Sequence, residues 1–149
     1  MMKKLLIYYS LSGNGDAVAA YLADRGFDVR KVEPMSQPPK KFFAQILRCG
    51  FNAGRKHCEP LRDFDPDVSA YDEIAIGSPV WNGRLSCPVN TVLRDADLSG
   101  KRVTFVLYSG SGGASKAEKQ IRGRIPNAAI LHLREPKKNP ETLDRLSSL

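Results

Sequence analysis

Three short segments of the chain combine glycine, hydroxyl and aromatic residues in a way that suits ligand binding. Residues 10–15 (SLSGNG) offer serine hydroxyls and backbone N–H groups at the start of a predicted helix, which together suit a phosphate. Residues 79–83 (PVWNG) carry the only tryptophan, Trp81, whose face can stack on a flat heterocycle. Residues 109–113 (SGSGG) have almost no side chains, so their N–H groups can approach the edge of such a ring. Together the segments predict a ligand with one phosphate and one flat ring system.

Each segment taken singly also has a plainer interpretation. The first can be a serine-rich turn that caps a helix, and the third is also typical of a flexible linker. Trp81 can pack into the core, with Asn82-Gly83 as a simple turn. The occurrence of all three segments in one chain, each after an apolar run, is more specific than any one of them.

The elements that position these segments alternate between strand and helix. Strands are predicted over residues 4–9, 27–32, 74–77, 102–108 and 128–133. Helices are predicted over residues 17–23, 41–49, 88–96, 115–125 and 140–149, the last with Asn139 as its cap. Such alternation indicates a three-layer α/β fold, a doubly wound five-stranded parallel sheet with strand order 2-1-3-4-5. The three segments follow strands 1, 3 and 4, so we expect them to converge where the strand order reverses.

Composition and cysteine usage narrow the class of protein. The chain of 149 residues is 42% apolar and 26% charged, which predicts one soluble domain over residues 1–149. No apolar run approaches the ~20 residues that span a bilayer, and the five apolar residues after Lys4 are too few for a signal peptide. Three cysteines without a C-x-x-C pair argue against a disulfide framework and a zinc site. We therefore expect a cytoplasmic protein without a bound metal.

The three segments together resemble the flavodoxin-like family in a short-chain form, from residue 4 to about residue 133. SLSGNG resembles that family's T-x-T-G-x-T phosphate loop, IGSPVWNG its second flavin loop and YSGSGG its third. The resemblance implies an FMN-binding electron-transfer protein. Two alternatives stay open: an FMN-dependent NAD(P)H reductase of quinone-like substrates, and a domain of the same fold without bound flavin.

The resemblance also implies which residues contact FMN, and it implies no catalytic side chain. The phosphate contacts would be Ser10, Ser12, Gly13, Asn14 and Gly15. The ring would be lined by Pro79, Trp81, Asn82 and Gly83, with Ser109, Gly110 and Gly113 on its far edge. Within this set, Gly83 could flip its peptide at little steric cost when the flavin changes its protonation.

Two residues depart from the family's phosphate loop. Gly15 stands where the family pattern has a hydroxyl, so one donor is missing. Asp16 follows it, and a carboxylate near a phosphate dianion lowers affinity unless it points away.

The charge of the chain is a third departure, because typical flavodoxins are strongly acidic. The net charge is +7, and its excess concentrates between Lys40 and Arg62. This excess can be a solvated basic face, or it can attract an acidic partner or a second nucleotide. No nucleic-acid motif accompanies it. We expect a redox partner protein with an acidic docking surface.

A rival arrangement lies outside the three segments. Cys49 and Arg55 have the C-x5-R spacing, with Asp65-Pro66 downstream, as in low-molecular-weight tyrosine phosphatases. Cys49, however, ends a predicted helix, where the negative end of the dipole raises the pKa of a thiol and suppresses the thiolate. We therefore expect Cys49 not to act as a nucleophile.

Overall fold

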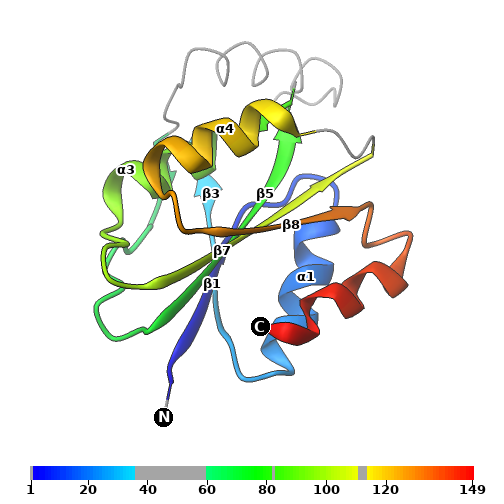
Figure 1. Ribbon diagram of the computed structural model, residues 1–149, viewed down its shortest axis with the longest axis horizontal. Helices are drawn as coiled ribbons and strands as arrows, with labels where there is room; N and C mark the ends of the chain where they lie inside the picture. The colour runs from blue at the N-terminus through cyan, green and yellow to red at the C-terminus, as the bar shows by residue number, and fades with distance from the viewer. Residues whose placement is uncertain (1, 36–59, 82, 111–113) are drawn as a thin grey trace.

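Five parallel strands form the central sheet in the computed structural model, which describes residues 2–35, 60–81, 83–110 and 114–149. The sheet order is β2-β1-β5-β7-β8 (Figure 1). Counted along the chain, these five strands have the order 2-1-3-4-5, so the predicted fold class is confirmed. The strands are β1 (Lys4–Tyr8), β2 (Asp28–Lys31), β5 (Glu73–Trp81), β7 (Arg102–Ser109) and β8 (Ala129–Arg134).

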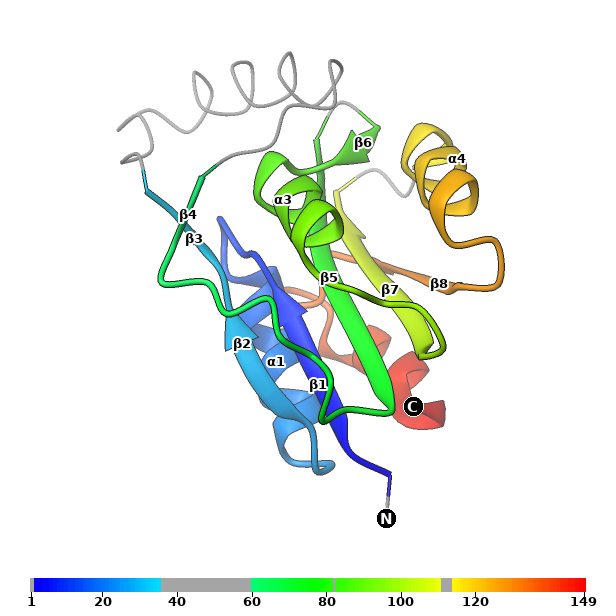
Figure 2. The ribbon, with the colours of Figure 1, turned by 90° about the vertical axis from the view of Figure 1, so that its left-hand side faces the viewer.

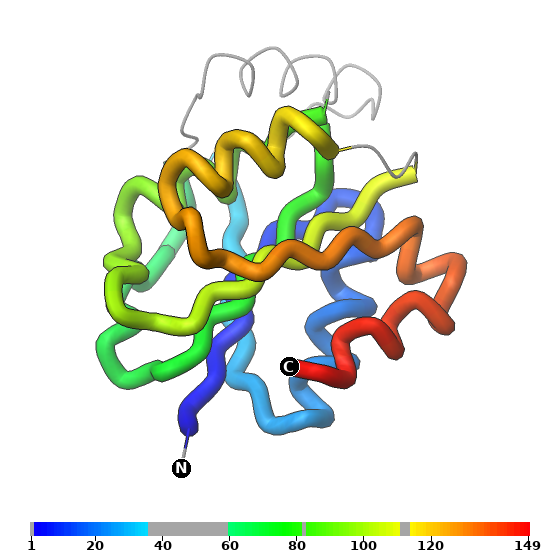
Figure 3. Tube along the Cα trace, in the orientation of Figure 1, coloured from blue at the N-terminus to red at the C-terminus, as the bar shows by residue number. Residues whose placement is uncertain are grey.

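Helices cover both faces of this sheet. Helices α3 (Cys87–Asp95) and α4 (Ser115–Arg124) lie on one face, and α1 (Asn14–Ala23) lies on the other (Figure 2). The C-terminal 3-10 helix η1 (Pro140–Ser148) packs beside α1 (Figure 3). The central strands are apolar on both faces, as parallel strands between two helix layers must be.

Alternate residues of each strand enter two separate apolar clusters. On β1, Ile7 packs toward α3 and α4, whereas Leu6 packs toward α1. On β7, Phe105 likewise packs toward α3 and α4, and Val106 packs toward α1. This alternation determines toward which face of the sheet each residue at the carboxyl end of a strand points.

Strand β5 is longer than the sequence predicted. It was expected to end at Gly77 and runs to Trp81, where it pairs antiparallel with β6 (Arg84–Leu85). Trp81 pairs with Arg84, so the two strands form a hairpin, and Gly83, which directly precedes β6, has a φ of 75°. At the base of the hairpin, the hydroxyls of Ser78 and Ser86 lie 3.0 Å apart. The ring-binding segment is therefore largely strand, not loop.

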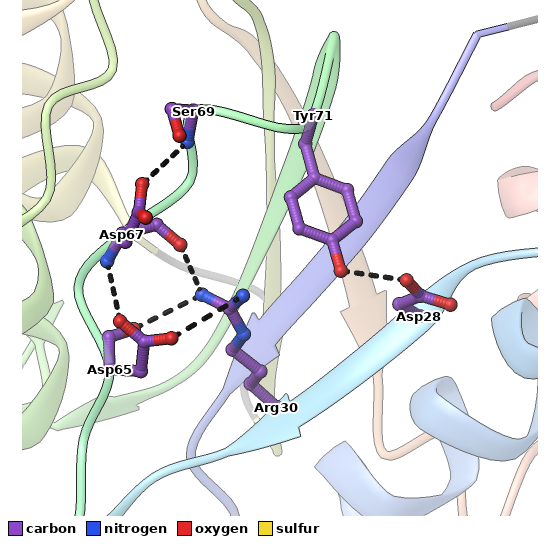
Figure 4. Close-up of polar contacts among 6 residues, drawn as sticks. All are labelled: Asp28, Arg30, Asp65, Asp67, Ser69 and Tyr71. Atoms are coloured by element: carbon purple, nitrogen blue, oxygen red, sulfur yellow. Dashed lines mark hydrogen bonds and ion pairs between the residues drawn. The ribbon is translucent and has the colours of Figure 1, made fainter.

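An arginine holds the irregular segment 63–72, which leads into β5, against β2. The guanidinium of Arg30 donates to the carbonyl oxygens of Asp65 (3.1 Å) and Asp67 (2.6 Å), and lies 5.5 Å from the centre of the Tyr71 ring (Figure 4). The Tyr71 hydroxyl donates to Asp28 at 2.7 Å. We call these residues the Arg30 clamp. Before the segment, β3 (Glu33–Pro34) pairs antiparallel with β4 (Leu61–Arg62).

The remaining differences concern the ends of the helices. The predicted helix over residues 41–49 lies outside the described residues. The last helix has 3-10 geometry, and Asn139 stands at its N-cap position as predicted but makes no side-chain cap hydrogen bond. Its side-chain amide instead donates to the Arg134 carbonyl at 3.1 Å. In the part of the chain that the structure describes, no helix has the length and apolar character needed to cross a membrane.

Candidate functional site

The loop between β1 and α1 is closed by one serine. The Ser10 hydroxyl oxygen accepts the N–H groups of Gly13 (3.2 Å) and Gly15 (3.1 Å). Gly13 has a φ of 96°, which favours glycine, and it forms the N-cap of α1 without a side chain to cap the helix. The first N–H groups of a helix lack partners within the helix, so this turn presents the positive end of α1 to a ligand.

The missing hydroxyl at position 15 has a steric explanation. A Cβ atom built on Gly15 would lie 2.5 Å from the Tyr108 hydroxyl, 2.8 Å from the Ser10 Cβ and 2.9 Å from the Tyr8 ring. The space that a threonine would need is thus filled from β7. Burial raises the pKa of Tyr108 well above its usual range, so this hydroxyl stays protonated and donates to the Tyr9 carbonyl.

Asp16, the second departure, is bound by two side chains of the sheet. Its carboxylate accepts from the Tyr8 hydroxyl at 2.8 Å and pairs with the Lys31 ammonium at 3.0 Å. Partial burial by itself raises the pKa of Asp16, but the hydrogen bonds from Tyr8 and Lys31 outweigh it and hold that pKa below the usual range. The carboxylate is therefore ionised and paired with Lys31, which Glu33 shares at 3.7 Å, and the sequence did not reveal this pairing.

A fourth segment, the turn after β8, also reaches the site. The backbone N–H of Lys137 donates to the Asn14 side-chain oxygen at 3.1 Å, and the Glu135 N–H donates to the Ser109 carbonyl at 3.1 Å. The turn thus links the first loop to the third. The sequence reasoning missed it, although a turn after the fifth strand necessarily lies at the carboxyl edge of the sheet.

The described residues that we expect to line the ring lie at the end of β5 and just after it. Trp81 is only 4% exposed, and its ring meets the Tyr9 ring edge-on, with centroids 5.6 Å apart. Pro79 lies opposite Tyr108 of β7. The Gly83 carbonyl accepts the Ala117 N–H at 2.8 Å, so a flip of the peptide after Gly83 costs this hydrogen bond. Trp81 is therefore part of the core as well as a candidate stacking residue.

The third loop begins at Ser109, whose hydroxyl lies 2.8 Å from the His132 Nε2. Burial lowers the pKa of His132, which favours the neutral ring. Gly110 is exposed, and a Cβ atom built there would lie 3.8 Å from the Glu135 carboxylate. Two expected contacts, Asn82 and Gly113, lie outside the described residues.

The residues that we expect to contact the phosphate lie together in the structure, and their chemistry suits a phosphate. Ser10, Ser12, Gly13, Asn14 and Gly15 form one turn at the start of α1. The turn offers hydroxyl donors at the positive end of α1, and the Asp16 carboxylate beside it is already paired. These residues fit the phosphate of a mononucleotide.

The rival phosphatase arrangement gains no support from its one described residue. Asp65, the candidate acid, has its carboxylate 3.8 Å from Arg30 and accepts the Asp67 N–H at 2.9 Å, within the Arg30 clamp. Cys49 and Arg55 lie outside the described residues. Among the described residues, no group of three or more His, Cys, Asp or Glu side chains is placed to hold a metal ion.

Comparison with known proteins places the chain in a family. The model of the family described as Flavodoxin matches residues 3–138, and no curated protein sequence matches the chain. The chain is similar in structure to a protein assigned as a flavoprotein from Bacteroides eggerthii (20% identity, 99% of each chain covered, TM-score 0.75). It is also similar to a flavoprotein from Lactobacillus acidophilus in complex with FMN (19% identity, 95% of this chain and 98% of that chain covered, TM-score 0.71). Because the family model spans nearly the whole chain, the protein belongs to the flavodoxin family.

Proposed function

We propose that this flavodoxin-family protein binds FMN at the carboxyl ends of β1, β5 and β7 and acts as an electron carrier. The observation that carries the proposal is the turn at the start of α1, which Ser10 holds closed and whose neighbouring carboxylate, Asp16, is paired with Lys31. The similar flavoprotein from Lactobacillus acidophilus, described in complex with FMN, supports the same cofactor. When bound, FMN supplies the redox chemistry, and the protein supplies binding and orientation.

In this proposal different residues of the site bind different parts of FMN. The hydroxyls of Ser10 and Ser12 would donate to the phosphate at the positive end of α1, in a turn whose shape the Gly13 and Gly15 N–H groups fix through Ser10. Trp81 and Pro79 lie beside the ring and exclude water from one face. The backbone of Ser109 and Gly110 approaches the opposite edge. No side chain is assigned a proton-transfer step.

A reductase is the alternative function at the same site. The chain is similar to a structure assigned as a quinone reductase from Klebsiella pneumoniae, at 12% identity and a TM-score of 0.52, which concerns the fold alone. Reductase activity needs a second site for NAD(P)H. Quinone-dependent oxidation of NADPH by the FMN-loaded protein would favour the reductase, and its absence favours the carrier.

The first prediction concerns ligand choice. Apoprotein titrated with FMN should quench flavin fluorescence at micromolar concentrations, and riboflavin should bind more weakly because it lacks the phosphate. FAD should not bind better than FMN, since the three loops offer one phosphate site and no adenine site. Flavin fluorescence and the visible absorbance spectrum measure all three. If FMN at these concentrations leaves the fluorescence unchanged, the proposed cofactor is wrong.

The positive charge of the protein leads us to propose a redox partner with an acidic surface. Most of the basic segment 40–62 lies outside the described residues, but α4 also carries exposed cations. Lys116 and Lys119 lie in its first half, and Lys116 adjoins the Gly83 turn, 3.7 Å from where a Gly83 Cβ would lie. An acidic surface docking over these lysines would lie next to the proposed ring site.

Reversal of both α4 lysines should therefore slow electron exchange with an acidic redox protein and leave FMN affinity unchanged. Salt should slow this exchange in the wild type, because the Debye length falls from about 10 Å at 0.1 M to about 3 Å at 1 M salt. In the K116E/K119E variant the attraction that salt screens is gone, so the exchange rate should no longer fall as salt is added. Stopped-flow exchange with one acidic and one basic redox protein measures this. The K3E/R102E variant, with the same charge change at the amino end of the sheet, is the control. Equal slowing in both variants would mean that net charge matters and α4 does not.

A further inference from the structure

A lysine outside the three family loops lies directly against the phosphate turn. The Lys137 side chain passes over Gly13: a Cβ atom built there would lie 3.0 Å from the lysine Cδ, 3.2 Å from Nζ and 3.4 Å from Cε. The ammonium group is thus at the N-cap of α1, where the helix dipole already favours an anion.

We propose that Lys137 binds the phosphate dianion and makes this site prefer FMN to riboflavin. The inference rests on the proposed function, and it assigns to the phosphate a residue that follows the fifth strand. Gly15 leaves the turn one hydroxyl short of the family pattern, because Tyr108 fills that space. The ammonium of Lys137 supplies a charged donor on the neighbouring side of the same turn, and charge-assisted hydrogen bonds are stronger than neutral ones.

The backbone holds this lysine in place. Its N–H donates to Asn14, the first residue of α1, at 3.1 Å. The preceding Glu135 has a φ of 41° and fixes the turn, because its carbonyl accepts the N–H groups of Lys138 and Asn139, each at 2.9 Å. Only the side chain of Lys137 has to be ordered on binding, which limits the entropic cost.

The carboxylate nearest to the turn does not compete for Lys137. Asp16 pairs with Lys31 at 3.0 Å, an ammonium that also lies 3.7 Å from Glu33, and it accepts from the Tyr8 hydroxyl at 2.8 Å. Lys137 makes no hydrogen bond to Asp16 and affects it only as the second of two charges that lower its pKa. Its ammonium therefore remains available to a ligand.

The adjacent lysine offers a matched control. Lys138 belongs to the same turn, has the same charge and is exposed like Lys137, but its ammonium lies 3.5 Å from the Glu135 carboxylate, whereas Lys137 lies over Gly13. Replacement of either lysine by methionine removes one charge and keeps an unbranched apolar side chain. In K137M the methionine can still cover Gly13.

The test compares FMN and riboflavin affinities of the wild type, K137M and K138M by fluorescence titration at several salt concentrations. K137M should bind FMN about tenfold more weakly, which corresponds to about 1.4 kcal/mol. It should bind riboflavin as the wild type does, and its FMN affinity should depend less on salt. K138M should match the wild type for both ligands. Urea unfolding of each apoprotein checks that the fold is intact.

The contrary outcomes separate this inference from the proposed function. If K137M binds FMN as tightly as the wild type, Lys137 does not contact the phosphate and the inference is overturned. If K137M loses FMN and riboflavin equally, the lysine acts on the shape of the site and the inference is again overturned. A wild-type protein that binds neither flavin overturns the proposed function itself.

Discussion

Replacement of Gly15 by threonine should weaken FMN binding by about tenfold or more and destabilise the apoprotein by about 1–3 kcal/mol, the usual cost of overpacking. The substitution restores the hydroxyl that the family pattern has at this position, so the motif alone predicts tighter binding. The structure predicts the opposite, because the new Cβ would lie 2.5 Å from the Tyr108 hydroxyl. The turn must shift to relieve this contact, and its N–H groups shift with it.

A second substitution tests this explanation. In G15T/Y108F the hydroxyl that causes the closest contact is gone, so part of the FMN affinity should return. Recovery should be incomplete, since the Ser10 Cβ at 2.8 Å and the Tyr8 ring at 2.9 Å still crowd the new side chain. Y108F alone should cost about 1 kcal/mol of stability, because the Tyr9 carbonyl loses its donor. Tighter FMN binding by G15T than by the wild type would contradict the steric account.

The parts of the fold that depend on local pattern were predictable from the sequence. The apolar run at residues 4–9 became β1, and the runs before the second and third loops became β5 and β7. Their order follows from the alternation of strands and helices, since right-handed crossovers leave few topologies. The convergence of the loops then follows from parallel strands that end at one edge of the sheet.

What the sequence could not supply depends on contacts between distant residues. The extension of β5 to Trp81 requires pairing with β6, and the sequence showed the Asn82-Gly83 dipeptide without showing which strands it joins. Position 15 has no room for a side chain because Tyr108 of β7 fills the space. The partner of Asp16 lies on β2, in Lys31. In each case a side chain from another strand explains the loop residue, and the spacing of residues along the chain does not reveal that contact.

Trp81 is the residue for which burial changes the expected result most. The sequence left two interpretations of Trp81 open, a stacking residue or a core residue. Since Trp81 is 4% exposed and packs on Tyr9, W81A should lower the free energy of unfolding by about 3–5 kcal/mol, as large-to-small core substitutions do. This is a large share of the roughly 5–15 kcal/mol typical of a domain. Circular dichroism during urea unfolding measures it, because the variant lacks the only tryptophan.

Stacking and packing by Trp81 are separable with a control from the same apolar cluster. Phe105 is fully buried in the middle of β7, so F105L destabilises the core without touching the proposed ring site. At temperatures where every variant is folded, F105L should bind FMN and riboflavin like the wild type. W81A should bind both flavins several-fold more weakly, because stacking contributes about 0.5–1.5 kcal/mol beyond buried area and acts on the ring that the two ligands share. If W81A is as unstable as expected but keeps its flavin affinity, Trp81 serves the core alone, and the stacking face must come from another residue.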